Sequence, residues 1–238
     1  MPIISKDKMQ ERQTIDDAAK HLILCEGKDD QGFLEQFMCS SAFSEHEMDD
    51  VQVLRYKGKD NLRNEMKAFC VAPGFSHICS LLVIRDADNN IESARDSVKD
   101  AFRERLLPVP DAEYIWASNE RIKTGFLLMP SCSSHSQNGA LEDLCWKIMT
   151  EKQGKSIHEE VETFLQTLEE SEIRKYSHKN KALLHTYFSA TDKLIAASIG
   201  RAAEMGAFDW SSPELKPLHD FLVEMVSNTT QDVDETLE

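Results

Sequence analysis

In the segment HICSLLVIRDADNN (77–90), the apolar run LLVI is followed by Arg85 and then by two acids, Asp86 and Asp88. A shorter segment, HLILCEG (21–27), has the same layout and ends in Glu26 followed by a glycine. Short apolar runs that stop at charged or turn-forming residues are typical of strands buried on both faces. The two segments therefore predict central strands of a parallel sheet.

Helical and strand-like segments alternate around these two runs. Alternation of this kind is typical of α/β proteins, in which helices cover both faces of a mostly parallel sheet. The expected helices are 30–41, 60–71 and 90–107, and the further expected strands are 50–58, 112–118 and 123–130.

The second half of the chain has a helical pattern. A loop of small residues, SCSSHSQNG (131–139), separates it from the strands. Ser212 and Pro213 are a typical cap and first-turn residue for the last helix. We therefore expect an α/β core over residues 1–130 and a helical C-terminal region over 131–238, packed on or beside the core. The expected helices are 141–151, 156–170, 180–189, 191–205 and 212–226.

Composition places the chain among soluble intracellular proteins. It has 238 residues, 41% of them hydrophobic, which is enough to bury a core. No apolar run approaches the roughly 20 residues of a membrane span, and the first residues lack a signal peptide, so we expect a cytoplasmic protein without membrane contact. The six cysteines form no CxxC pair, which favours reduced, buried thiols. A catalytic role for Cys132 is the alternative.

Charge is distributed unevenly along the sequence. The net charge of −15 repels nucleic acid at long range. Yet residues 173–181 carry Arg174, Lys175, Lys179 and Lys181 without an acid, and residues 55–67 hold more bases than acids. Each strip fits either a phosphate-backbone contact or a merely solvated face.

Three carboxylates are expected to meet at one edge of the sheet. Glu26, Asp86 and Asp88 each follow a predicted strand, and the carboxyl ends of parallel strands share the edge at which ligands bind. Carboxylates this close repel one another, and a hard divalent cation such as Mg2+ relieves that repulsion. As the alternative, the DADNN sequence is also a good turn and helix cap.

LILCEGKDD, followed by LLVIRDADNN, resembles the Toprim domain of topoisomerases, bacterial primases, OLD-family nucleases and ribosomal-RNA maturation ribonucleases. Glu26 matches the Toprim glutamate, Asp30 the acid four residues later, and Asp86 with Asp88 the DxD motif. The resemblance covers about residues 20–130. It implies a Toprim-like, mostly parallel sheet and a site that uses Mg2+ or Mn2+.

KTGFLLMP followed by NGALEDL resembles small standalone Toprim proteins and OLD-type nucleases. That resemblance implies Glu142 as a further metal ligand, with Asp143 as the second choice; the alternative for Glu142 is an acid in a helix first turn. OLD-type nucleases also have a catalytic lysine downstream, for which Lys181 or Lys179 is the candidate. The segment 188–222 resembles the tail of standalone Toprim proteins.

Several features of other Toprim proteins are missing from the sequence. There is no GxxxxGK[ST] motif, so we expect no ATPase in this chain. The four tyrosines lie in strand-like or helix-like segments and are interpreted as packing residues, which argues against a topoisomerase. The zinc-binding region of primases is also absent.

The sequence thus predicts a divalent-metal-dependent phosphodiesterase, most simply a DNA or RNA endonuclease. Asp30 would position Glu26 or a metal-bound water, and Lys59 or Lys181 would neutralise the phosphate. Lys57, Lys59 and Lys179 are the expected nucleic-acid contacts. The alternatives are a module that acts only with a separate ATPase, as in phage-defence systems, and a nucleotidyl transferase. A homodimer is a further possibility.

Overall fold

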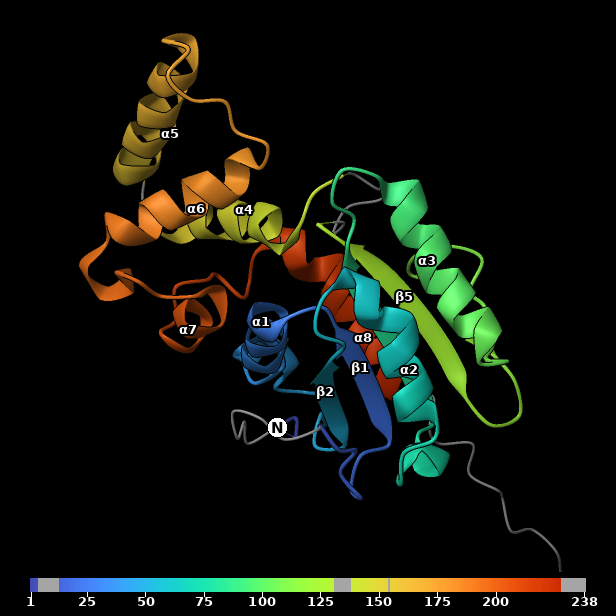
Figure 1. Ribbon diagram of the computed structural model, residues 1–238. Coiled ribbons are helices and arrows are strands. Elements are labelled where there is room, and N and C mark those ends of the chain that lie inside the picture. Colours follow the sequence, from blue (N-terminus) through green and yellow to red (C-terminus); the bar gives the residue numbers. More distant parts are fainter. Residues whose placement is uncertain (4–12, 131–137, 154, 228–238) are drawn as a thin grey trace, which may run out of the picture.

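The computed structural model describes residues 1–3, 13–130, 138–153 and 155–227 (Figure 1). They form a mixed α/β structure, as the strand–helix alternation predicts. No helix among these residues is long and apolar enough to cross a membrane. Cys132 and most of the loop expected at 131–139 lie outside the described residues.

Five strands form one sheet in the order β2-β1-β3-β5-β4. All neighbours pair in parallel except β4, which is antiparallel to β5. The strands are β1 (His21–Cys25), β2 (Val51–Arg55), β3 (Ser80–Asp86), β4 (Ala117–Ser118) and β5 (Lys123–Met129). The prediction of a mostly parallel sheet is therefore confirmed, although β4 is much shorter than the strand expected at 112–118.

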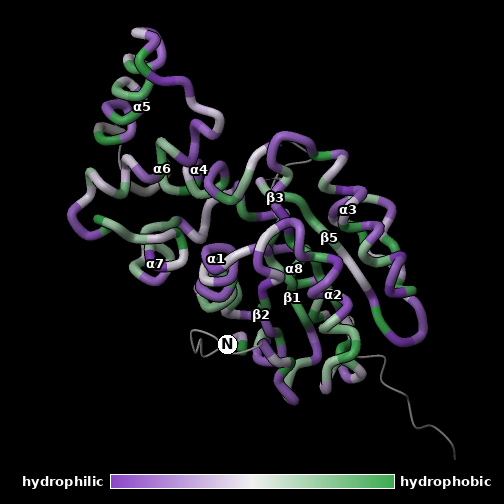
Figure 2. Tube along the Cα trace, viewed as in Figure 1, coloured by the Kyte–Doolittle hydropathy of each residue, from purple (hydrophilic) through white to green (hydrophobic). Residues whose placement is uncertain are grey.

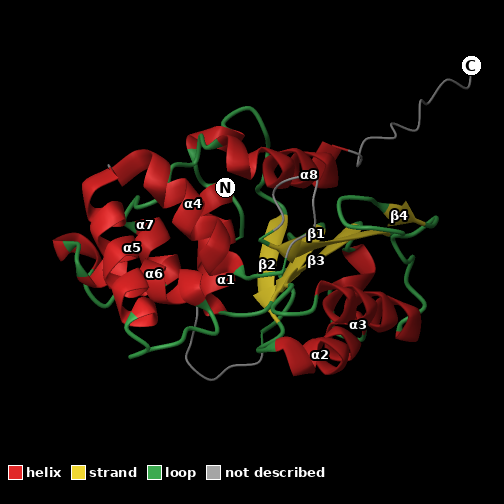
Figure 3. Ribbon diagram, turned by 90° about the horizontal axis from the view of Figure 1, so that it is seen from above, coloured by secondary structure: helices red, strands yellow, loops and turns green. Residues whose placement is uncertain are grey.

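Alternate strand side chains point to opposite faces, as in any strand. Leu22 and Leu24 of β1 join one core cluster with α2 (Leu62–Cys70) and α3 (Ile91–Glu104), whereas Ile23 belongs to a second cluster on the other face. That second face is covered by α1 (Lys28–Met38) and α8 (Lys216–Ser227). Figure 3 shows α2 and α3 on one side of the sheet and α8 on the other.

Helix α8 approaches the sheet closely at Gly125 of β5. A Cβ atom at this position would come within 2.9 Å of the rings of Phe221 and Trp116. These two rings stack with their centroids 4.5 Å apart. Helix α8 thus covers the sheet to which β1 belongs.

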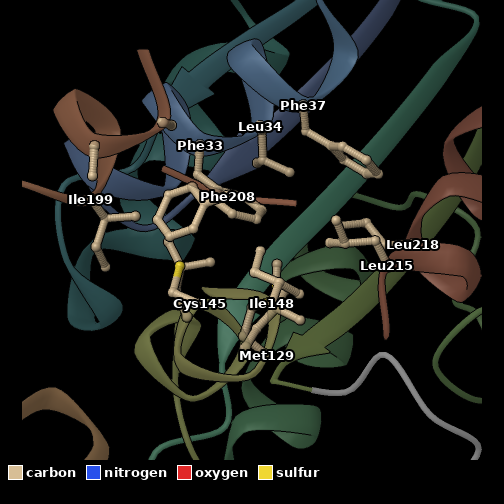
Figure 4. Close-up of a cluster of buried hydrophobic side chains, with 14 of the residues drawn as sticks. Phe33, Leu34, Phe37, Met129, Cys145, Ile148, Ile199, Phe208, Leu215 and Leu218 are labelled. Carbon is tan, nitrogen blue, oxygen red and sulfur yellow. The ribbon is translucent and has the colours of Figure 1, made fainter. Parts of the chain in front are cut away.

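The remaining helices follow β5 and extend the second core cluster away from the sheet. They are α4 (Leu141–Gln153), α5 (Lys155–Glu170), α6 (Lys179–Ser189) and α7 (Ile199–Glu204). Figure 4 shows Phe33 of α1 beside Phe208, whose ring centroid is 5.5 Å away. Figure 2 shows mostly hydrophobic residues along β1 and a mixture of hydrophilic and hydrophobic residues along the helices. The division of the chain near residue 130 stays a prediction.

The helix expected over 191–205 is wrong in its first half. The structure has a short 3-10 turn at Asp192–Leu194, and α7 begins only at Ile199. Ala196 has φ 59°, which breaks the helical path, and the Ser198 side chain then caps α7. Similarly, Ser212 and Pro213 begin a 3-10 turn, and α8 starts at Lys216.

Candidate carboxylate site

A cavity of about 420 Å³ lies at the carboxyl edge of the sheet, and the four carboxylates expected to bind metal all line it. Glu26 directly follows β1, Asp86 ends β3, Asp88 lies in the next loop, and Glu142 is in the first turn of α4. The sheet therefore brings together residues that are far apart in the sequence.

Backbone hydrogen bonds hold the Asp88 loop against the segment that leads into α4. The Asp88 amide donates to the Gly139 carbonyl at 2.7 Å, and the Gly139 amide donates to the Asp88 carbonyl at 2.8 Å. Gly139 has φ 145°, and a Cβ there would lie 2.9 Å from the Asp143 carboxylate and from Pro130. A glycine is thus required where the two loops meet.

Asp86 and Asp30 are both tied to backbone amides. The Leu141 amide, at the start of α4, donates to Asp86 Oδ1 at 3.1 Å. The Gly27 amide donates to Asp30 Oδ2 at 2.9 Å, and Asp30 is buried in the first turn of α1. Asp30 does not line the cavity itself. Its hydrogen bond to Gly27, the residue after Glu26, places it beside Glu26.

Burial and mutual repulsion disfavour the charged forms of these acids. The pKa of Glu26 is raised by burial and then by Asp88. Burial, followed by the neighbouring acids Asp30, Glu26 and Glu142, raises the pKa of Asp86 well above its ordinary value. Burial also raises the pKa of Asp30 to about 7. The cluster therefore favours either protons or a cation.

Two lysines supply positive charge at the rim of the cluster. Lys59 Nζ lies 3.0 Å from Asp88 Oδ2, and Lys181 Nζ lies 2.8 Å from Glu142 Oε1. Each hydrogen bond raises the pKa of its lysine. Lys59 and Lys181 are thus both at the site that the sequence predicts for them.

One carboxylate oxygen in the cluster has no partner. Glu26 Oε1 accepts the Lys59 backbone N–H at 3.1 Å, whereas Glu26 Oε2 is buried without a hydrogen bond among the described residues. A buried, unsatisfied carboxylate oxygen is a free ligand for a hard cation. The donor types therefore fit Mg2+ or Mn2+.

The side chains as they stand do not yet surround a metal ion. Within the described part of the chain, no group of three or more His, Cys, Asp or Glu side chains is arranged to hold one. Because lysines contact Asp88 and Glu142, a divalent cation that used all four carboxylates would have to displace two ammonium groups.

The basic residues expected to bind nucleic acid divide into two groups. Lys179 lines the cavity, where it pairs with Glu169 at 2.6 Å, and Lys181 lines it as well. Lys57 is exposed and lies outside the cavity lining. Arg174 and Lys175 are exposed in the connection between α5 and α6.

Polar residues that sequence reasoning missed complete the wall. Helices α4 and α6 lie side by side (Figure 1), and the Asn180 amide of α6 donates to the Asp143 carboxylate. Three of the missed residues reach the cavity because α6 folds back over α4, for which the sequence has no local signal, whereas Asn89 directly follows Asp88 and Asn138 precedes Gly139. The missed lining residues are Asn89, Asn138, Ser177, His178 and Asn180.

A family model described as "Protein of unknown function (DUF3226)" matches residues 20–227 of the chain. A search of curated proteins found no match. Two similar solved structures are both of the C-terminal region of the Xanthomonas campestris pv. campestris OLD protein. The one phased with platinum is 11% identical, covers 87% of this chain and 93% of its own, and has a TM-score of 0.40. The one phased with mercury is 12% identical, covers 87% of this chain and 95% of its own, and has a TM-score of 0.41. Similarity at this level assigns no activity to the chain.

Proposed function

The chain belongs to the DUF3226 family, and from its carboxylate site we propose that it is a divalent-metal-dependent phosphodiesterase that cleaves nucleic acid. One observation carries the proposal. Glu26, Asp86, Asp88 and Glu142 line a single cavity at the edge of the sheet where α/β proteins bind their ligands. The order and placement of these acids also support a Toprim-type site.

Each residue of the site has a role in this proposal. Glu26, Asp86, Asp88 and Glu142 would hold Mg2+ or Mn2+, which when bound polarises the scissile phosphate and lowers the pKa of a water molecule. Asp30 holds the Gly27 amide and so fixes the direction in which Glu26 points.

Lys59 and Lys181 would have a second role once a cation neutralises the acids. Lys181 lines the cavity, Lys59 contacts Asp88 of its lining, and both lysine side chains are about half exposed. Released from Asp88 and Glu142, they can contact the phosphate and offset the negative charge that develops on it.

The test is a cleavage assay with the purified protein, Mg2+ or Mn2+, and single- and double-stranded DNA and RNA. Glu26→Gln keeps the shape of the side chain and removes the charge, so it should lower turnover by at least about 100-fold while binding of the substrate is kept. Glu159→Gln makes the same chemical change on an exposed face of α5 and should leave turnover unchanged. Robust cleavage by Glu26→Gln would place the chemistry elsewhere.

A partner-dependent module is the second candidate, and the lysine contacts favour it. With Lys59 on Asp88 and Lys181 on Glu142, the acids are neutralised by the protein itself. In this case the isolated wild type is inactive with either metal, and cleavage appears only when a separate ATPase is added. Glu26→Gln should abolish that activity too.

A further inference from the structure

A second cavity, of about 370 Å³, lies at the opposite edge of the sheet from the carboxylates. It is formed where α2 and α3 end and where the chain enters β3 and β5. Strand β3 separates the two cavities, and its seven residues span roughly 20 Å at about 3.3 Å per residue. A ligand in this cavity therefore cannot share the carboxylate site.

Two arginines line the cavity, and no acid does. Neither Arg105 nor Arg121 forms an ion pair within the described part of the chain. The chain has a net charge of −15, and four of its other arginines have carboxylate partners. Such pairs are formed by Arg63, Arg95, Arg103 and Arg201.

Each guanidinium group retains unused hydrogen-bond donors. The Nε of Arg105 is buried without a partner and out of a ligand's reach, but the two Nη groups of Arg105 also form no hydrogen bond among the described residues. Arg121 donates through Nη1 to the Phe75 carbonyl at 3.4 Å, which uses one of its five N–H groups. Arg105 lies at the C-cap of α3, where a positive charge is favourable, but this position leaves its buried Nε unsatisfied.

The other walls of the cavity are largely apolar. Val71, Pro73 and Leu107 line it, together with the Phe75 segment. The guanidinium carbon of Arg121 lies 5.1 Å from the centre of the Phe75 ring, so the ring helps to fix the position of the charge. The cavity thus combines two guanidinium groups with an apolar surface.

We propose that this cavity binds a small phosphate monoester whose organic part is apolar. A phosphate monoester carries between one and two negative charges at neutral pH, which matches two guanidinium groups better than a carboxylate does. Guanidinium groups also pair with phosphate oxygens through two parallel hydrogen bonds. The apolar walls then contact the organic part, and the volume suits a small molecule.

Calorimetry on the full chain tests the proposal with three probes: phenyl phosphate, inorganic phosphate and benzoate. Phenyl phosphate should bind with 1:1 stoichiometry and at least ten times more tightly than either of the others. Arg105→Gln and Arg121→Gln should each weaken it at least tenfold. Arg103→Gln changes an exposed arginine of the same helix end and should bind normally, as should Asp86→Asn at the carboxylate site.

Thiol labelling locates the bound ligand. Cys70 lines the cavity, whereas Cys79 is exposed outside its lining. Saturating phenyl phosphate should slow alkylation of Cys70 at least fivefold and leave Cys79 unchanged, as read by mass spectrometry of peptides. The proposal is overturned if no probe binds at millimolar concentration, if benzoate binds as tightly as phenyl phosphate, if both arginine variants bind normally, or if Cys70 is not protected.

Discussion

Single residues at the carboxylate site show which parts of it the sequence can predict. Glu26, Asp86 and Asp88 could be predicted because each follows a strand and parallel strands share one carboxyl edge. His178 and Asn180 could not, because they reach the cavity only through the packing of α6 on α4. Nor does the sequence indicate that Asp88 is contacted by a lysine.

Asp30 should make the metal-free protein less stable as the pH rises. Its pKa is about 7 in the folded state, mainly because of burial, against about 3.9 in an unfolded chain. Between these values the folded state binds more protons than the unfolded state, so this residue's contribution to stability falls from about pH 4 to pH 7.

Asp30→Asn removes this pH dependence and keeps an acceptor for the Gly27 amide. Urea denaturation in the presence of a chelator should show the free energy of unfolding of the variant gaining on wild type with rising pH, by an amount of the order of 4 kcal/mol at pH 8. A difference that is constant over this range would contradict the raised pKa.

Lys181 should compete with a divalent cation for Glu142. Lys181→Met removes the ammonium group that lies 2.8 Å from this carboxylate, so the affinity for Mn2+ should rise roughly three- to tenfold while any nuclease activity falls. Lys179→Met is the matched control, because Lys179 is in the same turn but pairs with Glu169. Calorimetry measures the Mn2+ affinity of both variants, and equal affinities would exclude competition between Lys181 and the cation.

At the scale of elements, the local sequence pattern predicts the strands and the amphipathic helices. It does not predict the positions at which they are interrupted. The break before α7 depends on Ala196, which has φ 59°. No pattern in the sequence predicts this backbone angle. In the segment expected as a strand at 112–118, Tyr114 has φ 59°, and only Ala117 and Ser118 pair with β5. Local periodicity thus predicts that an element exists better than where it ends.

Helices α1 and α7 pack so closely that one of them tolerates no side chain at the crossing. A Cβ on Gly32 would lie 2.8 Å from the Gly200 Cα, whereas a Cβ on Gly200 would lie 3.4 Å from the Gly32 Cα. Gly32→Ala should therefore destabilise the protein by about 1–3 kcal/mol, because backbone must move. Gly200→Ala should be close to neutral, since better helix propensity offsets the contact. Thermal unfolding distinguishes them, and equal effects would contradict this packing.

For the whole molecule, the parallel sheet sets the position of the acids, but the C-terminal helices decide which residues face them. Residues 177–181 form the wall opposite Glu26 and Asp86. This wall carries Lys179 and Lys181, but five carboxylates line the same cavity, so the cavity attracts nucleic acid only once a bound cation neutralises these acids. The affinity for nucleic acid should then depend on a few local charges.

The connection between α5 and α6 should supply these charges unequally. Lys179 and Lys181 already contact Glu169 and Glu142, whereas Arg174 and Lys175 form no ion pair within the described residues. Arg174 and Lys175 can therefore contact phosphate groups without breaking an ion pair. The double variant Arg174→Gln, Lys175→Gln should therefore reduce the slope of log affinity against log salt concentration by nearly two, since each phosphate contact contributes about 0.7–0.9.

Arg103→Gln with Lys216→Gln removes the same net charge from residues that pair with Asp100 and Asp220, and its slope should equal that of wild type. Fluorescence anisotropy without divalent metal measures all three proteins on one labelled oligonucleotide. If the two double variants lose the same slope, net charge alone governs binding, and the cavity does not select where the nucleic acid lies.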